Sequence, residues 1–160
     1  MSREDFFQPH QLVIGVVGAA SPTEDGYALA REVGRLLAQA GAVVLCGGLG
    51  GIMEGACLGA GEGGGLSVGL LPGSLSEEAN PYLTIPLPTA LDHTRNAIIA
   101  RAARGLIAVE GGLGTISEMA LALKMKKPVV GLATKYDLPG LVKAATPREA
   151  VNKILTAVRG

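Results

Sequence analysis

The stretch Leu106-Ile107-Ala108-Val109-Glu110-Gly111-Gly112-Leu113-Gly114-Thr115-Ile116-Ser117-Glu118 joins an apolar run to an amphipathic pattern. Residues 106–109 are apolar and β-favouring, which predicts a buried strand. From Ile116 onward apolar residues recur at helical spacing, which predicts a helix. Three glycines between them let the backbone turn tightly and approach a ligand. Because a helix N-terminus attracts anions through its free N–H groups and its dipole, this order of elements predicts a phosphate-binding site.

Two well-known phosphate-binding loops do not fit this stretch. No Lys-Ser/Thr pair follows the last glycine, as a P-loop requires, and the glycine spacing is not that of the dinucleotide fingerprint. Glu118 has two interpretations. Thr115 and Glu118 match the S/T-x-x-E capping box, which the spacing alone favours. In the functional interpretation, Glu118 is a carboxylate held beside the phosphate cradle, where it binds a hydroxyl or stabilises positive charge.

Two earlier strands are followed by turns of the same kind. Residues 12–17 and 43–46 are apolar runs, and small residues follow at 18–20 and glycine-rich ones at 47–51. Ser21-Pro22-Thr23-Glu24 is predicted to cap and open the helix after the first turn. Since parallel strands bring their carboxyl ends to one edge of the sheet, the three turns are predicted to converge on one site.

The remaining chain continues the alternation of strands and helices. Further strands are predicted at residues 66–71, 83–85 and 128–132, further helices at 52–60, 94–104 and 147–158, and a loop at 133–145. Asp92 is predicted to cap helix 94–104, and Thr146-Pro147-Arg148-Glu149 to open the last helix with a capping box. The fold class is therefore α/β, a Rossmann-like, doubly wound, mostly parallel sheet with helices on both faces, in one domain over residues 1–160.

Charge and composition exclude several classes of partner. Fourteen basic and fourteen acidic residues cancel, and the 160 residues include only five aromatic ones, so neither nucleic acid nor a membrane surface is expected as a partner. The polar start of the chain lacks the apolar core of a signal peptide. Cys46 and Cys57 are too few for a disulfide framework and lack metal-site spacing, which predicts free thiols, a cytoplasmic location and no metal.

Two segments outside the glycine turns point to a ligand or to a partner. Arg95 and Asn96 fall in the first turn of helix 94–104, where an arginine opposes the helix dipole. Either solvent or an anionic ligand explains its presence. The helix 52–60 carries interior glycines, each unfavourable by about 1 kcal/mol. They predict close packing against the sheet or a partner, and this helix is a candidate interface for a homo-oligomer.

These motifs together resemble the SLOG superfamily over residues 13–158. The resemblance is carried by Gly111-Gly112-x-Gly114-Thr115-x-x-Glu118, by Gly47-Gly48-x-Gly50-Gly51-Ile52-Met53 and by Arg95 between them. The superfamily includes LOG phosphoribohydrolases, molybdenum cofactor carrier proteins and proteins labelled "possible lysine decarboxylase". Two positions depart from the LOG pattern, because Glu110 replaces the motif proline and Asn96 replaces a lysine. The Arg95-Asn96 pair is more similar to the carrier branch.

The resemblance implies three functions. The first is a binding or carrier protein for a phosphorylated, nucleotide-like ligand, with the molybdenum cofactor as the leading candidate and an AMP-like nucleotide as the other. No cofactor is expected to be required. The second is a LOG-like hydrolase that cleaves nucleoside 5′-monophosphates to base and ribose 5-phosphate with Arg95 and Glu118 as catalytic pair. The third is a cytosolic nucleotide sensor. A pyridoxal-phosphate lysine decarboxylase is not expected, because no framework for that cofactor is visible.

The turns and the resemblance together define a set of candidate residues and an assembly. The ligand-binding candidates are Gly18, Ala19, Ser21, Gly47, Gly48, Gly51, Met53, Arg95, Asn96, Gly111, Gly112, Gly114 and Thr115. The resemblance also implies a homo-oligomer, a dimer or a tetramer.

Overall fold

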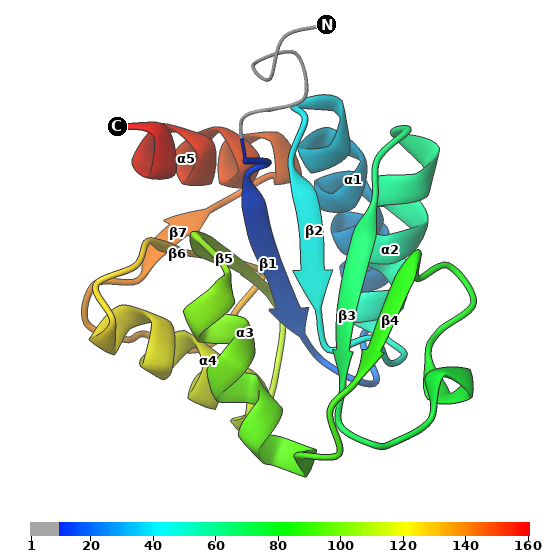
Figure 1. Cartoon of the computed structure of the whole chain (residues 1–160). Helices are drawn as coiled ribbons and strands as arrows, with labels where there is room; N and C mark the ends of the chain where they lie inside the picture. Colours follow the sequence, from blue (N-terminus) through cyan, green and yellow to red (C-terminus); the bar gives the residue numbers. More distant parts are fainter. Residues whose placement is uncertain (1–9) are drawn as a thin grey trace, which may run out of the picture.

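The computed structural model describes residues 10–160. Residues 1–9 lie outside the described part, and with them most of the segment on which the prediction about a signal peptide rests. Seven parallel strands form one sheet in the order β4-β3-β2-β1-β5-β6-β7 (Figure 1). Their bounds are β1 Val13–Gly18, β2 Val43–Cys46, β3 Ser67–Leu71, β4 Ile85–Pro88, β5 Gly105–Val109, β6 Val129–Leu132 and β7 Val142–Ala144. The predicted doubly wound, mostly parallel sheet is confirmed.

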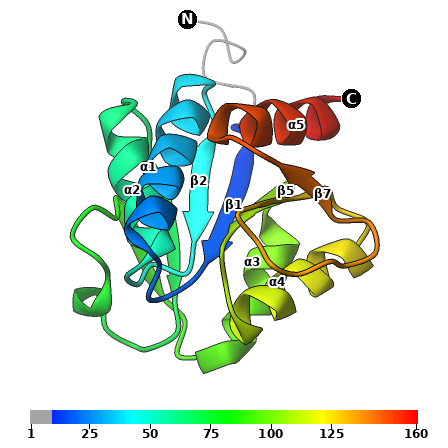
Figure 2. The ribbon, with the colours of Figure 1, turned by 180° about the vertical axis from the view of Figure 1, so that it is seen from behind.

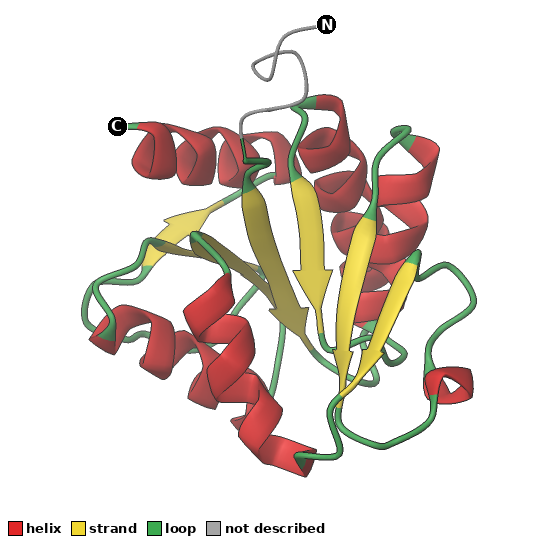
Figure 3. Ribbon diagram, viewed as in Figure 1, coloured by secondary structure: helices red, strands yellow, loops and turns green. Residues whose placement is uncertain are grey.

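Helices cover both faces of the sheet. The helices α1 (Glu24–Gln39), α2 (Ile52–Glu62) and α5 (Pro147–Arg159) pack on one face, as the view from behind shows (Figure 2). The helices α3 (Arg95–Ala102) and α4 (Leu113–Lys124) pack on the other (Figure 3). Every residue of β2, β5 and β6 is buried. Strands buried on both faces explain why the sequence shows apolar runs there rather than alternation.

Two edge strands differ from the predicted ones. β4 begins at Ile85, where the prediction ended, and contains Pro86 and Pro88. Because β4 is an edge strand, no further strand requires hydrogen bonds from the N–H groups that its prolines lack. β7 lies within residues 133–145, which were predicted to be a loop. It has three residues and sits at the opposite edge, too short for periodicity to reveal.

Three predicted helix starts were wrong. Thr23, not Ser21, caps α1, and its hydroxyl accepts a hydrogen bond from the N–H of Gly26 at 3.0 Å. Asp92 does not cap α3 but lies in a 3₁₀ turn, Asp92–Thr94, with a positive φ of 49°. α4 begins at Leu113 with Gly112 as its N-cap, so the capping box of Thr115 and Glu118 does not form. The glycine turn is therefore shorter than expected, and helix α4 begins three residues earlier than Ile116.

The predicted cap of α5 is confirmed, but the return bond of its capping box goes to the residue before the cap. The hydroxyl of Thr146 accepts a hydrogen bond from the N–H of Glu149 at 3.1 Å, and the carboxylate of Glu149 accepts one from the N–H of Ala145 at 2.9 Å. Pro147 occupies the first helical turn, where its missing N–H is harmless.

The glycines of α2 bring it into backbone contact with α1. A Cβ on Gly34 would lie 2.1 Å from the carbonyl oxygen of Ala56, and one on Gly59 would lie 1.8 Å from that of Arg31. The predicted close packing is thus a contact between two helices of the same chain. The glycine side of α2 is consequently not free to form an oligomer interface.

No helix within residues 10–160 is long and apolar enough to cross a membrane.

Candidate functional site

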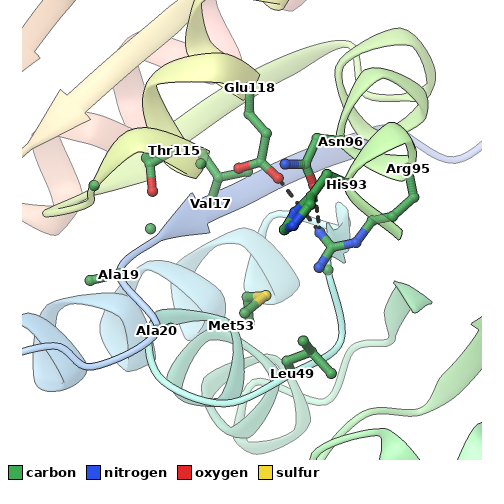
Figure 4. A pocket seen from close by; sticks show the side chains of 14 residues that line it. Val17, Ala19, Ala20, Leu49, Met53, His93, Arg95, Asn96, Thr115 and Glu118 are labelled. Atoms are coloured by element: carbon green, nitrogen blue, oxygen red, sulfur yellow. Dashed lines mark hydrogen bonds and ion pairs between the residues drawn. The ribbon is translucent and has the colours of Figure 1, made fainter. Parts of the chain in front are cut away.

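A pocket of about 330 Å³ opens beyond the carboxyl ends of β1 and β2 and at the start of α4 (Figure 4). β1 lies between β2 and β5, the point at which the strand order reverses, where open α/β sheets bind ligands. The lining residues are Val17, Gly18, Ala19, Ala20, Gly47, Leu49, Met53, His93, Arg95, Asn96, Gly112, Gly114, Thr115 and Glu118.

Most of the candidate residues meet at this pocket, and four of them do not line it. Gly18, Ala19, Gly47, Met53, Arg95, Asn96, Gly112, Gly114, Thr115 and Glu118 all belong to the lining. Ser21 is exposed outside it. The other three are glycines that pack against protein atoms. A Cβ on Gly48 would lie 2.6 Å from the Leu71 side chain, and a Cβ on Gly51 would lie 2.4 Å from the Ala19 carbonyl oxygen. A Cβ on Gly111 would lie 2.6 Å from the Thr115 side chain. These three glycines shape the turns.

Four lining residues were not predicted from the sequence: Val17, Ala20, Leu49 and His93. The first three are chain neighbours of predicted residues, so extending each turn by one position would have included them. His93 is exposed and lies in the 3₁₀ turn before α3. Its one signal in the sequence is its position two residues before Arg95.

Arg95 is the first residue of α3 and is almost fully buried. Its Nη1 donates a hydrogen bond to Oδ1 of Asn96 at 2.9 Å. Its Nε is buried and has no hydrogen-bond partner among the described residues. A Cβ on Gly47 would lie 2.3 Å from Nη1, so the absence of a side chain there makes room for the guanidinium. Burial lowers the pKa of Arg95, which reflects the unfavourable placement of a charge away from water.

Glu118 faces Arg95 from the second turn of α4. Figure 4 shows the two side chains pointing toward one another, with Glu118 Oε1 3.7 Å from Arg95 Nη1. This distance is too long for a hydrogen bond. Burial raises the pKa of Glu118 to about 7, because the attraction of Arg95 only partly offsets the loss of water. The carboxylate and the guanidinium therefore retain hydrogen-bonding capacity toward a ligand.

The N-terminus of α4 supplies a second polar feature. The N–H groups of its first turn have no partners within the helix, and Gly112, Gly114 and Thr115 from this turn line the pocket. A Cβ on Gly112 or on Gly114 would meet no atom within 4 Å, so both glycines border open space. This is the geometry in which a helix start binds phosphate.

Glu110, which stands where the LOG motif has a proline, does not line the pocket. It has a positive φ of 52°, and its carboxylate accepts hydrogen bonds from the N–H of Thr23 at 3.1 Å and from the Thr23 hydroxyl at 2.8 Å. A Cβ on Gly26 would lie 1.6 Å from Glu110 Oε1, so α1 accommodates this carboxylate closely. Glu110 thus occupies the N-terminus of α1 and leaves that of α4 free for an anion.

Among residues 10–160, no group of three or more His, Cys, Asp and Glu side chains is arranged to hold a metal ion.

The family of the chain follows from a comparison with family models. The model described as "SLOG cluster4 family" matches residues 11–157. The chain belongs to the SLOG cluster4 family. The resemblance to the SLOG superfamily is thereby confirmed.

Relatives of this SLOG cluster4 chain match over nearly their whole length. An uncharacterized protein of Archaeoglobus fulgidus is 42% identical over 144 residues, which are 90% of this chain and 95% of the relative. The structure of the molybdenum cofactor binding protein from Rippkaea orientalis has a TM-score of 0.87 at 33% identity, covering 93% of this chain and 98% of that one. The molybdenum cofactor carrier protein of Chlamydomonas reinhardtii has a TM-score of 0.84 at 34% identity, covering 94% and 100%. The similarity to carrier proteins therefore extends to the complete fold.

Proposed function

We propose that this protein binds a phosphorylated ligand as a carrier, and that the ligand is the molybdenum cofactor. The observation that carries the proposal is the buried Arg95, whose Nε lacks a partner among the described residues beside a pocket that ends at a free helix N-terminus. A buried unsatisfied donor is unfavourable by about 1–3 kcal/mol, which an acceptor on a bound ligand would offset. The similarity to two proteins named for this cofactor supports the choice of ligand.

The lining residues fit the polar groups of a phosphorylated pterin. The first-turn N–H groups of α4, together with Thr115, would hold the phosphate. Arg95 and Asn96 would donate to acceptors on the rest of the ligand, and Glu118 would accept from its donors. The apolar side chains of Val17, Leu49 and Met53 would cover the ring system. When bound, the cofactor carries molybdenum–dithiolene chemistry, and the residues of this chain hold it and limit its contact with water.

We also propose a cellular location and an assembly for the protein. Both cysteines are free, which agrees with a reducing cytoplasm. We propose a homo-oligomer, as the family resemblance implies, formed through a surface other than the glycine side of α2.

The experiment is to purify the full chain from cells that make the cofactor and to measure pterin fluorescence after release, per mole of protein. We call this quantity retained pterin. Wild type is expected to retain pterin and Arg95→Ala to retain little. Wild-type protein without pterin, prepared under anaerobic conditions, would contradict the carrier proposal.

A second candidate function has an observation of its own. Glu118 has a pKa near 7 and lies 3.7 Å from Arg95 inside the pocket, an arrangement that suits hydrolysis of a nucleoside 5′-monophosphate. Release of ribose 5-phosphate from AMP tests it. Turnover by wild type that is lost in both Glu118→Gln and Arg95→Ala would favour the hydrolase over the carrier.

A further inference from the structure

Two cysteines lie in contact next to the pocket, outside the residues that line it. Cys46 is the last residue of β2, and Cys57 lies in the middle of α2. Their sulfur atoms are 3.6 Å apart, and both side chains are almost completely buried. The eleven-residue separation contains the glycine turn at residues 47–51. A covalent bond between these thiols would close a small loop around that turn.

The surroundings make the two thiols unequal. The hydrogen bond between them lowers the pKa of Cys57 and raises that of Cys46, as expected when the Cys46 thiol donates to the sulfur of Cys57. The Nδ2 of Asn80 lies 3.7 Å from the Cys57 sulfur and further favours its anionic form. Cys57 is therefore the more nucleophilic partner, and Cys46 is placed to react with it.

Both cysteines are linked directly to the pocket. Cys46 precedes Gly47, against which the Arg95 guanidinium packs. Asn80 donates from Nδ2 to the carbonyl of Leu49 at 3.0 Å and from its N–H to that of Gly48 at 2.9 Å. The side-chain amide of Asn80 thus both holds the lining turn and contacts the sulfur of Cys57. A disulfide needs a sulfur–sulfur distance of about 2.05 Å, so its formation has to rotate the two buried side chains or shift the end of β2 or α2. Rotation of Cys57 would break its contact with Asn80, so either movement alters the contacts that hold this turn.

We propose that Cys46 and Cys57 form a reversible disulfide in response to peroxide, and that the disulfide weakens ligand binding in the adjacent pocket. The thiolate of Cys57 attacks one oxygen of H2O2, the O–O bond breaks, and hydroxide leaves and takes a proton to become water. The resulting sulfenic acid is attacked by the sulfur of Cys46, which gives up its proton as the S–O bond breaks and a second water leaves. Two thiols lose two electrons, and one peroxide becomes two waters.

The burial of both thiols favours a small oxidant over a large one. Cys46 is 0% exposed and Cys57 1%. A water-sized peroxide reaches such sulfur atoms during small openings of the structure, whereas glutathione disulfide does not fit. Oxidation by H2O2 without formation of a mixed disulfide with glutathione is therefore the expected pattern.

The test follows the disulfide and the turn separately. After exposure of the folded full chain to H2O2, a peptide map without reductant is expected to show a peptide linked through residues 46 and 57, and dithiothreitol is expected to remove it. Amide hydrogen exchange at residues 47–49 is expected to increase in the oxidised form. The affinity for AMP, measured by calorimetry, is expected to fall by at least about fivefold. Cys57→Ser is the matched control, since it keeps the shape of the site and should show none of these changes.

Three results would overturn the proposal: no linked peptide after peroxide, reaction with glutathione disulfide in preference to peroxide, or a disulfide that leaves exchange at residues 47–49 and AMP affinity unchanged. The expected loss of affinity rests on the proposed ligand site, so reduced protein that does not bind AMP would count against an AMP-like ligand and not against the disulfide or the molybdenum cofactor. The exchange measurement then still decides whether the disulfide alters the pocket.

Discussion

Glu118 and Arg95 face one another across the pocket with Oε1 and Nη1 3.7 Å apart, one from α4 and the other from α3. Both side chains are buried, yet they are not close enough to satisfy one another. Because α3 and α4 are joined through β5 and pack against one another on one face of the sheet, this pair is a product of the fold. It is also the part of the site whose charge state can be measured without a ligand.

The raised pKa of Glu118 predicts a pH-dependent stability. Its value of about 7, above the ordinary 4.5, means that the folded chain binds a proton that the unfolded chain releases. The free energy of unfolding should therefore decrease as pH rises from 4.5 to 7, by up to roughly 3 kcal/mol at 1.36 kcal/mol per pKa unit. Glu118→Gln should lack this decrease. Urea unfolding of both proteins at pH 5 and pH 8 measures it, and parallel pH profiles would contradict the assignment.

Gly47→Ala should displace Arg95 without unfolding the protein. The new methyl group would overlap the guanidinium, which is the mobile end of a side chain and can swing away. Retained pterin is expected to fall about tenfold, as for the loss of one charged hydrogen bond. Gly50→Ala is the control from the same turn, because a Cβ there meets nothing within 4 Å. Equal losses in both variants would mean that the turn itself, rather than Arg95, is affected.

Glu110→Gln should affect stability and not ligand binding. The carboxylate accepts two hydrogen bonds from Thr23 at the start of α1, and the amide would lose the charge that strengthens them. A decrease in unfolding free energy of about 1 kcal/mol is expected. Retained pterin should be unchanged, since Glu110 does not line the pocket. Glu24→Gln, in the first turn of the same helix, removes an equal charge and controls for the helix dipole.

Lys127 binds the C-terminal end of α3, the helix that begins with Arg95. Its Nζ donates to the carbonyls of Ala100 at 2.9 Å and of Ala103 at 2.6 Å, and also to that of Arg101. Lys127→Met leaves these carbonyls without their donor and should lower the unfolding free energy by about 1–3 kcal/mol. Lys124→Met, an exposed lysine on α4, should change it little. Retained pterin should also fall in Lys127→Met alone, because α3 carries Arg95.

The sequence was sufficient for the five inner strands of the sheet and for most of the pocket because both depend on local patterns. Fully buried strands appear as apolar runs, and the glycine turns after 12–17, 43–46 and 106–109 follow directly from them. Parallel topology then places the turns at one edge.

The parts that could not be predicted depend on contacts between distant residues. The S/T-x-x-E spacing at Thr115 favoured a helix cap, but the cap is Gly112. The proximity of Glu118 to Arg95 was implied by the family resemblance alone and not by the spacing. The direction of Glu110 depends on Thr23, 87 residues away. A three-residue edge strand such as β7 is too short to show a period.

The most direct test of the account is retained pterin in Gly112→Val compared with Gly61→Val. Both glycines have open space where a Cβ would be placed, so both variants should fold, but only Gly112 lines the pocket at the start of α4. We predict that Gly112→Val loses its retained pterin and that Gly61→Val keeps the wild-type amount. Undiminished pterin in a folded Gly112→Val variant would contradict the anion site on which the proposed function rests.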